Sequence, residues 1–120
     1  MRKRRNISHV STAPGSEPFG TEELSRALRD PDPFVRVAAL HRAAPEDTSV
    51  ETIGSALGDD YPLVRREAVR SLSRIGTTEA VRVLLQVSAH DLSAEVREEA
   101  VTALAGILRV GSAGADTASG

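Results

Sequence analysis

The sequence predicts an all-α fold, a short α-solenoid built from three helical hairpins. A motif that contains a Val-Arg pair recurs at intervals of about 30 residues, a period typical of stacked helical repeats. The 120 residues include no Cys or Trp and only two Phe and one Tyr. The core therefore has to consist of Leu, Val, Ile and Ala, which suits closely packed helices.

The repeated columns are defined by aligning Val35, Val64 and Val96. An aspartate stands five residues before each valine, and an arginine follows each valine directly. The aspartates are Asp30, Asp59 and Asp91, and the arginines are Arg36, Arg65 and Arg97. Apolar residues also stand four and eight positions after each valine, and these offsets lie on one helical face. Each motif is thus predicted to begin an amphipathic second helix.

A first helix is predicted before each second helix, at about 21–29, 49–57 and 79–89. Asp32 and Pro33 are typical of an N-cap and a first helical residue, because the carboxylate satisfies a free N–H group and proline lacks one. Thr48, three residues before a Glu, has the spacing of a capping box. Pro45 is expected to cut the second helix of the first repeat short, and Gly76 to end that of the middle repeat.

The chain is predicted to be disordered on both sides of the repeats. Residues 1–20 form a basic arm without a periodic apolar pattern, and residues 111–120 form a low-complexity tail. The repeat domain is predicted at 21–110, with repeats at about 21–47, 48–76 and 77–110. Because residues 2–5 are all basic and the whole chain has a net charge of −2, the repeat domain is acidic. The basic cluster suits a solubilising element or an electrostatic tether to nucleic acid or an anionic membrane.

Several kinds of protein and of site find no support in the sequence. No apolar run approaches the roughly 20 residues that span a bilayer, and no apolar segment follows the basic start as in a signal peptide, so a cytoplasmic protein is expected. His9, His41 and His90 lack the spacing of metal ligands. Neither a glycine-rich phosphate loop nor a serine nucleophile motif is present. We therefore expect no catalytic residue, no metal and no cofactor.

These features together resemble the HEAT-like repeat family, particularly its short bacterial type, which also occurs in phycobilin lyases. The resemblance covers about residues 21–110 and rests on the paired helices, the acidic turn, the Val-Arg pair and the alanine that follows. It implies an α-solenoid whose second helices line a concave, protein-binding surface, and it implies no single activity. It further implies that Arg36, Arg65 and Arg97 pair with turn aspartates of a neighbouring repeat, with ligand contact as the alternative role.

The best candidate site is a stripe of arginines on the middle second helix. Arg66, Arg70 and Arg74 follow one another at intervals of four residues, which places them on one side of the helix. The corresponding positions of the other repeats are not arginine, so stacking does not require these side chains. We expect a basic patch that binds an acidic peptide or a carboxylate-bearing partner. The alternative is a solvated face that Glu67 partly neutralises.

Two further features extend this candidate site. Glu95, Glu98 and Glu99 open the last second helix, where the helix dipole favours acidic residues and by itself explains them. The functional alternative is that they give the groove an acidic edge beside its basic centre. Tyr61 stands in a turn and is the one aromatic residue that we expect to act as an exposed anchor for a partner.

The sequence favours a non-enzymatic protein- or peptide-binding adaptor that uses the concave face of the solenoid. The alternative is a small accessory enzyme, or a factor that handles a chromophore or ligand, as the resemblance to phycobilin lyases implies. Nucleic-acid binding is disfavoured because the repeat domain is acidic. Three repeats are near the minimum for a stable stack and no polar capping repeat is recognisable, so a homodimer through an uncapped end is a further hypothesis.

Overall fold

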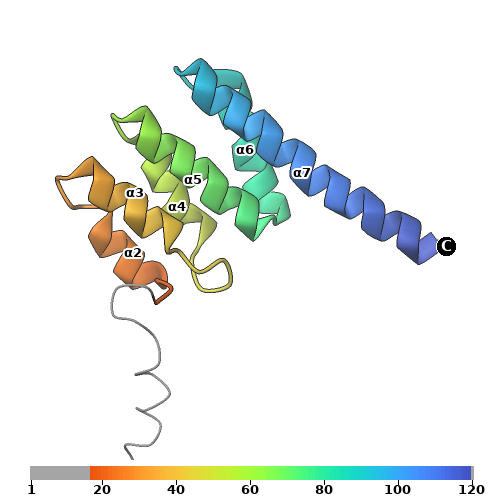
Figure 1. Ribbon diagram of the computed structural model, residues 1–120, viewed down its shortest axis with the longest axis horizontal. Helices are drawn as coiled ribbons and strands as arrows, with labels where there is room; N and C mark the ends of the chain where they lie inside the picture. The colour runs from red at the N-terminus through yellow and green to blue at the C-terminus, as the bar shows by residue number, and fades with distance from the viewer. Residues whose placement is uncertain (1–16, 120) are drawn as a thin grey trace, which may run out of the picture.

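The computed structural model describes residues 17–119, with side chains described as far as residue 110. Within that part of the chain, six α-helices and one 3-10 helix form three hairpins (Figure 1). They are α2 (Thr21–Ala27), α3 (Pro33–His41), α4 (Val50–Ser55), η1 (Ala56–Gly58), α5 (Pro62–Ile75), α6 (Thr78–His90) and α7 (Ala94–Ser119). The hairpins α2–α3, α4–α5 and α6–α7 confirm the predicted all-α solenoid.

The second helices α3, α5 and α7 lie side by side in one row, and α4 and α6 pass behind that row (Figure 1). Within the row, α3 contacts α5 and α5 contacts α7. The resulting slab measures 52 × 46 × 19 Å. Its thickness matches two layers of helices of about 10 Å each. Each second helix therefore has one face on the first helices and the opposite face open to solvent.

Aliphatic side chains and alanines form the core, as the composition predicts. The largest fully buried side chains come from all six helices and include Leu24, Leu40, Ile53, Val64, Leu72, Leu84 and Val96. The alanine column of the repeats is buried as well, at Ala39, Ala68 and Ala100. A small side chain in this column lets neighbouring helices approach closely.

Local sequence signals set several helix ends. The Asp32 carboxylate accepts a hydrogen bond from the Phe34 N–H at 2.9 Å, and Pro33 is the first residue of α3, as predicted. Gly76 ends α5 in the left-handed conformation (φ 65°), which favours glycine because it has no Cβ. In the first repeat, α3 ends at His41, ahead of Pro45.

The start of α4 differs from the predicted capping box. Ser49 is the N-cap, and its hydroxyl oxygen accepts a hydrogen bond from the Thr52 N–H at 3.0 Å. Thr48 instead donates its hydroxyl to the carbonyl oxygen of Ala44 at 2.7 Å and is buried. The prediction of Thr48 as the cap was therefore wrong, because this hydroxyl closes the preceding turn.

The ordered fold begins before the predicted boundary at residue 21. Residues 1–16 of the predicted arm, including the basic cluster at 2–5 and His9, lie outside the described residues. The Phe19 N–H, however, donates to the carbonyl oxygen of Arg42 at 2.8 Å, and its carbonyl accepts from the Ala44 N–H at 2.9 Å. The Arg42 guanidinium lies 3.9 Å from the centroid of the Phe19 ring. The end of the predicted arm is thus held against the first repeat.

The last helix also extends further than predicted. In place of a disordered tail from residue 111, α7 continues to Ser119. This segment contains no proline, and its three alanines have the highest helix propensity of any residue. The helix therefore continues beyond the predicted end of the third repeat.

Candidate functional site

An ion-pair ladder follows the edge of the slab where first helices turn into second helices. Arg36 donates from Nε and Nη2 to the two carboxylate oxygens of Asp59, at 2.7 and 3.1 Å. Arg65 binds Asp91 in the same way, at 3.0 and 3.2 Å. Each arginine also donates from Nη1 to a carbonyl oxygen of its own repeat, Arg36 to Asp30 and Arg65 to Asp59. These contacts, the turn-edge ladder, tie each repeat to the next.

The ladder pairs are largely removed from solvent. The side chains of Arg36 and Asp59 are each 12% exposed, and those of Arg65 and Asp91 are 10% and 7% exposed. Burial alone would raise the pKa of the Asp59 carboxyl, but hydrogen bonds from Arg36 and the Tyr61 N–H outweigh it, helped by the charges of Arg36 and Arg65. The pKa of Asp59 therefore lies below its ordinary value, and the hydrogen bond to Asp59 raises the pKa of Arg36.

The pairing of arginine with aspartate is incomplete at both ends of the stack. Arg97 donates from Nη1 to the carbonyl oxygen of Asp91 at 2.6 Å, and its Nε and Nη2 have no partner among the described residues. The Asp30 carboxylate accepts only the N–H of Asp32, at 2.9 Å, within the same part of the chain. The six repeated residues thus connect repeats inside the stack and are left half-paired where the stack ends.

Tyr61 also belongs to the turn edge. The Arg36 guanidinium lies 5.6 Å from the centroid of the Tyr61 ring, within the range of a cation–π interaction. The ring is half exposed. Tyr61 therefore lies against the ladder, and not with the arginine stripe as predicted.

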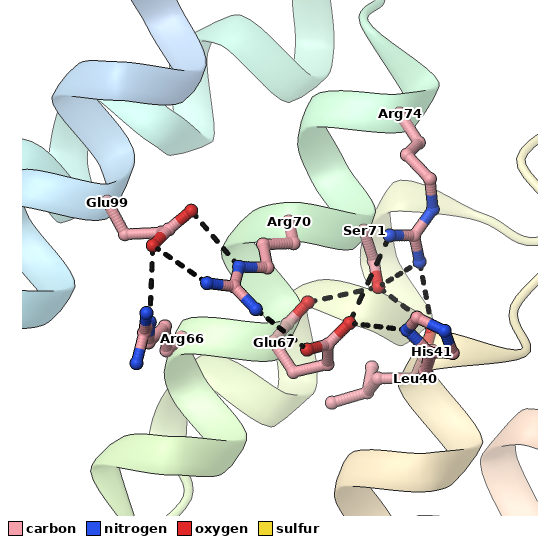
Figure 2. Close-up of polar contacts among 8 residues, drawn as sticks. All are labelled: Leu40, His41, Arg66, Glu67, Arg70, Ser71, Arg74 and Glu99. Atoms are coloured by element: carbon pink, nitrogen blue, oxygen red, sulfur yellow. Dashed lines mark hydrogen bonds and ion pairs between the residues drawn. The ribbon is translucent and has the colours of Figure 1, made fainter.

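Carboxylates of the chain itself bind the arginine stripe of α5 (Figure 2). Glu99 on α7 accepts hydrogen bonds from Nε of Arg66 at 3.2 Å and Nε of Arg70 at 3.1 Å. Glu67, which is buried on α5, lies 3.7 Å from Nη1 of Arg70 and 4.0 Å from Nη1 of Arg74. The stripe is therefore a network of alternating charges that joins α5 to α7. Glu67 partly neutralises it, as the alternative to a basic patch stated, and Glu99 adds a second carboxylate.

At its other end, this network reaches α3 (Figure 2). Nη2 of Arg74 donates to the carbonyl oxygen of Leu40 at 3.0 Å and to the Ser71 hydroxyl at 3.1 Å. Ser71 donates to the same carbonyl at 3.0 Å. Glu67 Oε2 lies 3.4 Å from Nδ1 of His41. Because the last carbonyls of a helix have no partner within it, Arg74 and Ser71 satisfy the C-terminal end of α3.

The pKa values of two members of the network are shifted. Burial alone would raise the pKa of Glu99, but hydrogen bonds from Arg70 and Arg66, together with their charges, hold it below its ordinary value. The hydrogen bond to Glu99 raises the pKa of Arg70. Glu99 is therefore held in its ionised form between two arginines.

An open hollow of about 280 Å³ lies between α5 and α7. Its lining consists of Arg66, Glu95, Glu98, Glu99 and Thr102. Arg66 uses only Nε toward Glu99, so its Nη1 and Nη2 have no partner among the described residues, and its side chain is 40% exposed. Glu95 and Glu98 form no ion pair in the same part of the chain. We call these five residues the α5–α7 hollow.

The structure thus divides the residues that the sequence grouped as one site. Arg66 and Glu98 meet in the α5–α7 hollow, while Glu67 and Arg74 lie toward α3. Glu99 was recognised only as part of an acidic edge, although it binds two of the three stripe arginines. A signal for this contact was present, because Glu67 and Glu99 share one repeat column, three residues after the valine. That column faces the preceding second helix.

Metal and membrane sites find no support in the part of the chain that the structure describes. No group of three or more His, Cys, Asp and Glu residues there is placed to hold a metal ion. His41 lies beside Glu67, but the other charged neighbours of Glu67 are Arg70 and Arg74, which do not suit a cation site. No helix among these residues has both the length and the apolar character needed to cross a membrane.

Comparisons with known proteins identify one family. The family model for HEAT repeats matches residues 21–105, which extend from the first residue of α2 into α7. Neither the curated proteins nor the solved structures include a match to the chain. The family match covers the turn-edge ladder and all five residues of the α5–α7 hollow.

Proposed function

Because this chain belongs to the HEAT repeat family, whose repeats are commonly protein-interaction scaffolds, we propose that it is a non-enzymatic adaptor that binds a protein segment in the α5–α7 hollow. One observation supports this proposal: Arg66, Glu95 and Glu98 line an open hollow and retain charged atoms that have no partner among the described residues. Inside the stack, in contrast, the charges of the turn-edge ladder pair with one another.

The geometry of Arg66 suits the recognition of a carboxylate. Its pairing with Glu99 through Nε fixes the side chain and leaves both terminal nitrogens to donate to one ligand. A guanidinium that is already held in place loses less entropy on binding and offers a planar fork to a carboxylate. Glu95 and Glu98 on the opposite wall accept hydrogen bonds from a cationic side chain. The hollow therefore favours a segment with an acidic residue close to a basic one.

Arg70 and Arg74 serve this site by supporting it. Arg70 uses Nε and Nη2 on Glu99 and approaches Glu67 with Nη1. Arg74 is occupied by the end of α3. We therefore assign partner contact to Arg66 among the stripe arginines, and assign the positioning of Glu99 and Glu67 to the other two.

The lining of the hollow also argues against the two alternative functions, chromophore handling and nucleic-acid binding. A chromophore-handling factor needs an apolar floor, but Thr102 is the only uncharged residue in this lining. A nucleic-acid site needs an extended basic surface, but three glutamates surround Arg66. Both arguments favour a polar protein segment as the ligand.

Selection from a library of random peptides displayed on phage tests this function. We expect peptides that bind the full chain to be enriched in Asp or Glu close to Lys or Arg. Loss of a charge-assisted contact in Arg66→Ala or Glu98→Gln should weaken their binding about tenfold. Fluorescence anisotropy with the selected peptides measures this change.

Arg82→Ala is the matched control, because Arg82 is exposed on α6, in the layer of first helices. Its binding should equal that of the wild type. Peptides that bind Arg66→Ala and Glu98→Gln as tightly as the wild type would show that the hollow is not the recognition site.

A further inference from the structure

The two ends of the stack carry complementary halves of the junction that joins repeats inside it. Each interior junction has two parts. One is a ladder pair, Arg36–Asp59 or Arg65–Asp91. The other is an apolar side chain that the next second helix covers. It stands five residues after the valine that anchors each repeat, at Leu40 and Val69, and both side chains are completely buried.

The C-terminal end of the stack presents the arginine half of such a junction. The Nε and Nη2 atoms of Arg97 have no partner within residues 17–110, although they occupy the position from which Arg36 and Arg65 bind the next repeat. Val101 occupies the column of Leu40 and Val69 but is 55% exposed. Leu108, further along α7, is exposed as well. No described residue covers this face of α7 as α7 covers α5.

The N-terminal end presents the aspartate half. The Asp30 carboxylate has no arginine partner among the described residues, unlike Asp59 and Asp91. Val35 is 38% exposed, whereas the valines of the other repeats, Val64 and Val96, are buried by the preceding repeat. Val35 lines an apolar groove of about 280 Å³, together with Phe19, Ala27, Phe34, Ala38, Ala39 and Arg42.

We propose that a second copy of this chain stacks head to tail on the first and continues the row of second helices. Arg97 of one copy binds Asp30 of the next, as Arg36 binds Asp59 and Arg65 binds Asp91 within the chain. α3 of the next copy covers Val101, and α7 of the first copy fills the groove beside Phe34 and Val35. This self-association is separate from the binding of a partner in the α5–α7 hollow.

Charge decides the direction of this contact. A two-fold dimer through either end joins two copies of the same face, so it offers each Arg97, or each Asp30, no partner from the opposite ladder column. A head-to-tail contact brings Arg97 to Asp30 and leaves one free end on each copy. Such a heterologous contact extends into chains of copies unless its rotation closes a ring.

Sedimentation equilibrium of the full chain tests the proposal. The average mass of the wild type should rise with concentration beyond that of a dimer. Asp30→Arg and Arg97→Asp each place like charges across the contact, and each should weaken association about tenfold or more. Mixing these two variants restores opposite charges at both kinds of contact, so the mixture should associate like the wild type.

A second pair of variants keeps the ladder residues intact. Phe34→Asp places a charge in the apolar groove at the N-terminal end and should reduce association. Leu63→Asp is its matched control, because Leu63 occupies the same column in the middle repeat and is also exposed. Circular dichroism of each variant checks that the helices are retained.

Three results would overturn the proposal. The first is a wild-type mass that stays that of one chain at every concentration. The second is a mass that stops at a dimer and responds to only one of the two charge variants, which would indicate a two-fold contact. The third is a mixture of Asp30→Arg and Arg97→Asp that fails to associate while both variants remain helical.

Discussion

Arg65 and Arg66 are neighbours in the chain but belong to two different regions of the molecule. Arg65 lies in the turn-edge ladder, where Asp91 and the carbonyl oxygen of Asp59 occupy its three nitrogens. Arg66 lies in the α5–α7 hollow, where a single bond to Glu99 leaves two nitrogens unpaired among the described residues. One step along a helix thus separates a charge that holds the stack together from one that is available to a partner.

This difference follows from the repeat itself. At each interior junction the repeated arginine and aspartate meet the same partner, so their hydrogen bonds are satisfied there. Arg66 has Val37 and Glu98 in the corresponding positions, and these residues cannot make the same contact. Repeated charges thus stabilise the solenoid, while unrepeated charges such as Arg66 distinguish the surface of one repeat from that of the next.

The largest effect is expected when an interior rung of the ladder is removed. Arg65→Ala leaves Asp91 buried without its partner and should lower the free energy of unfolding by about 3 kcal/mol. Arg97→Ala removes one hydrogen bond at the open end and should cost about 1 kcal/mol. Urea denaturation followed by circular dichroism measures both values. Equal losses for the two variants would mean that the inter-repeat pair adds no stability.

A smaller effect is expected from the apolar column that accompanies the ladder. Val69 is fully buried between α5 and α7, so Val69→Ala should cost about 2 kcal/mol. Val101 occupies the same column on the exposed side of α7, and Val101→Ala should change stability by less than about 0.5 kcal/mol in dilute monomer. A large loss for Val101→Ala under those conditions would show that another part of the chain covers this face.

The effect of pH on stability should be smaller still, and it should arise in both the turn-edge ladder and the α5–α7 hollow. The pKa values of Asp59 and Glu99 are below their ordinary values, so the folded state binds fewer protons than the unfolded state. Their contribution is complete above the ordinary carboxyl pKa of about 4 and is lost as the pH falls through the lower folded pKa. Thermal unfolding between about pH 5 and pH 2 should therefore show a falling midpoint temperature.

The variant Asp59→Asn separates the ladder from the rest of this pH dependence. It should flatten the fall in midpoint temperature, because the amide does not titrate. Asp60→Asn is the matched control, since Asp60 is exposed and next to Asp59 in the sequence. An unchanged pH profile for Asp59→Asn would contradict the role given to the ladder carboxylate.

The repeated part of the architecture could be predicted from the sequence. The Val-Arg columns and their spacing predicted three hairpins, and the aspartate of each turn marked the place of the ladder. These features are predictable because every junction imposes the same requirements on the same columns. The cap at Ser49, the packing of Phe19 and the extension of α7 were not predicted, since each depends on a contact or a helix end that does not recur.

The candidate site was harder to predict than the fold. The spacing of Arg66, Arg70 and Arg74 placed them correctly on one side of α5, but it could not show which side chains would meet them across the next junction. Glu99 lies 33 positions beyond Arg66 in the sequence but binds it on α5, and Arg74 binds the end of α3. The packing of α3, α5 and α7 against one another determines which arginine keeps guanidinium nitrogens available to a partner.

Double-mutant cycles test most directly whether the ladder holds the stack while the hollow remains available. One cycle uses Arg65→Ala, Asp91→Ala and the double variant, and the other uses Arg66→Ala, Glu99→Ala and their double variant. We predict a coupling energy of about 2 kcal/mol for Arg65 with Asp91, because the pair is buried and bidentate. For Arg66 with Glu99 we predict about 0.5 kcal/mol, because the Arg66 side chain is 40% exposed and makes a single bond to Glu99. A coupling for Arg66 with Glu99 that equals or exceeds that of the ladder pair would contradict this division.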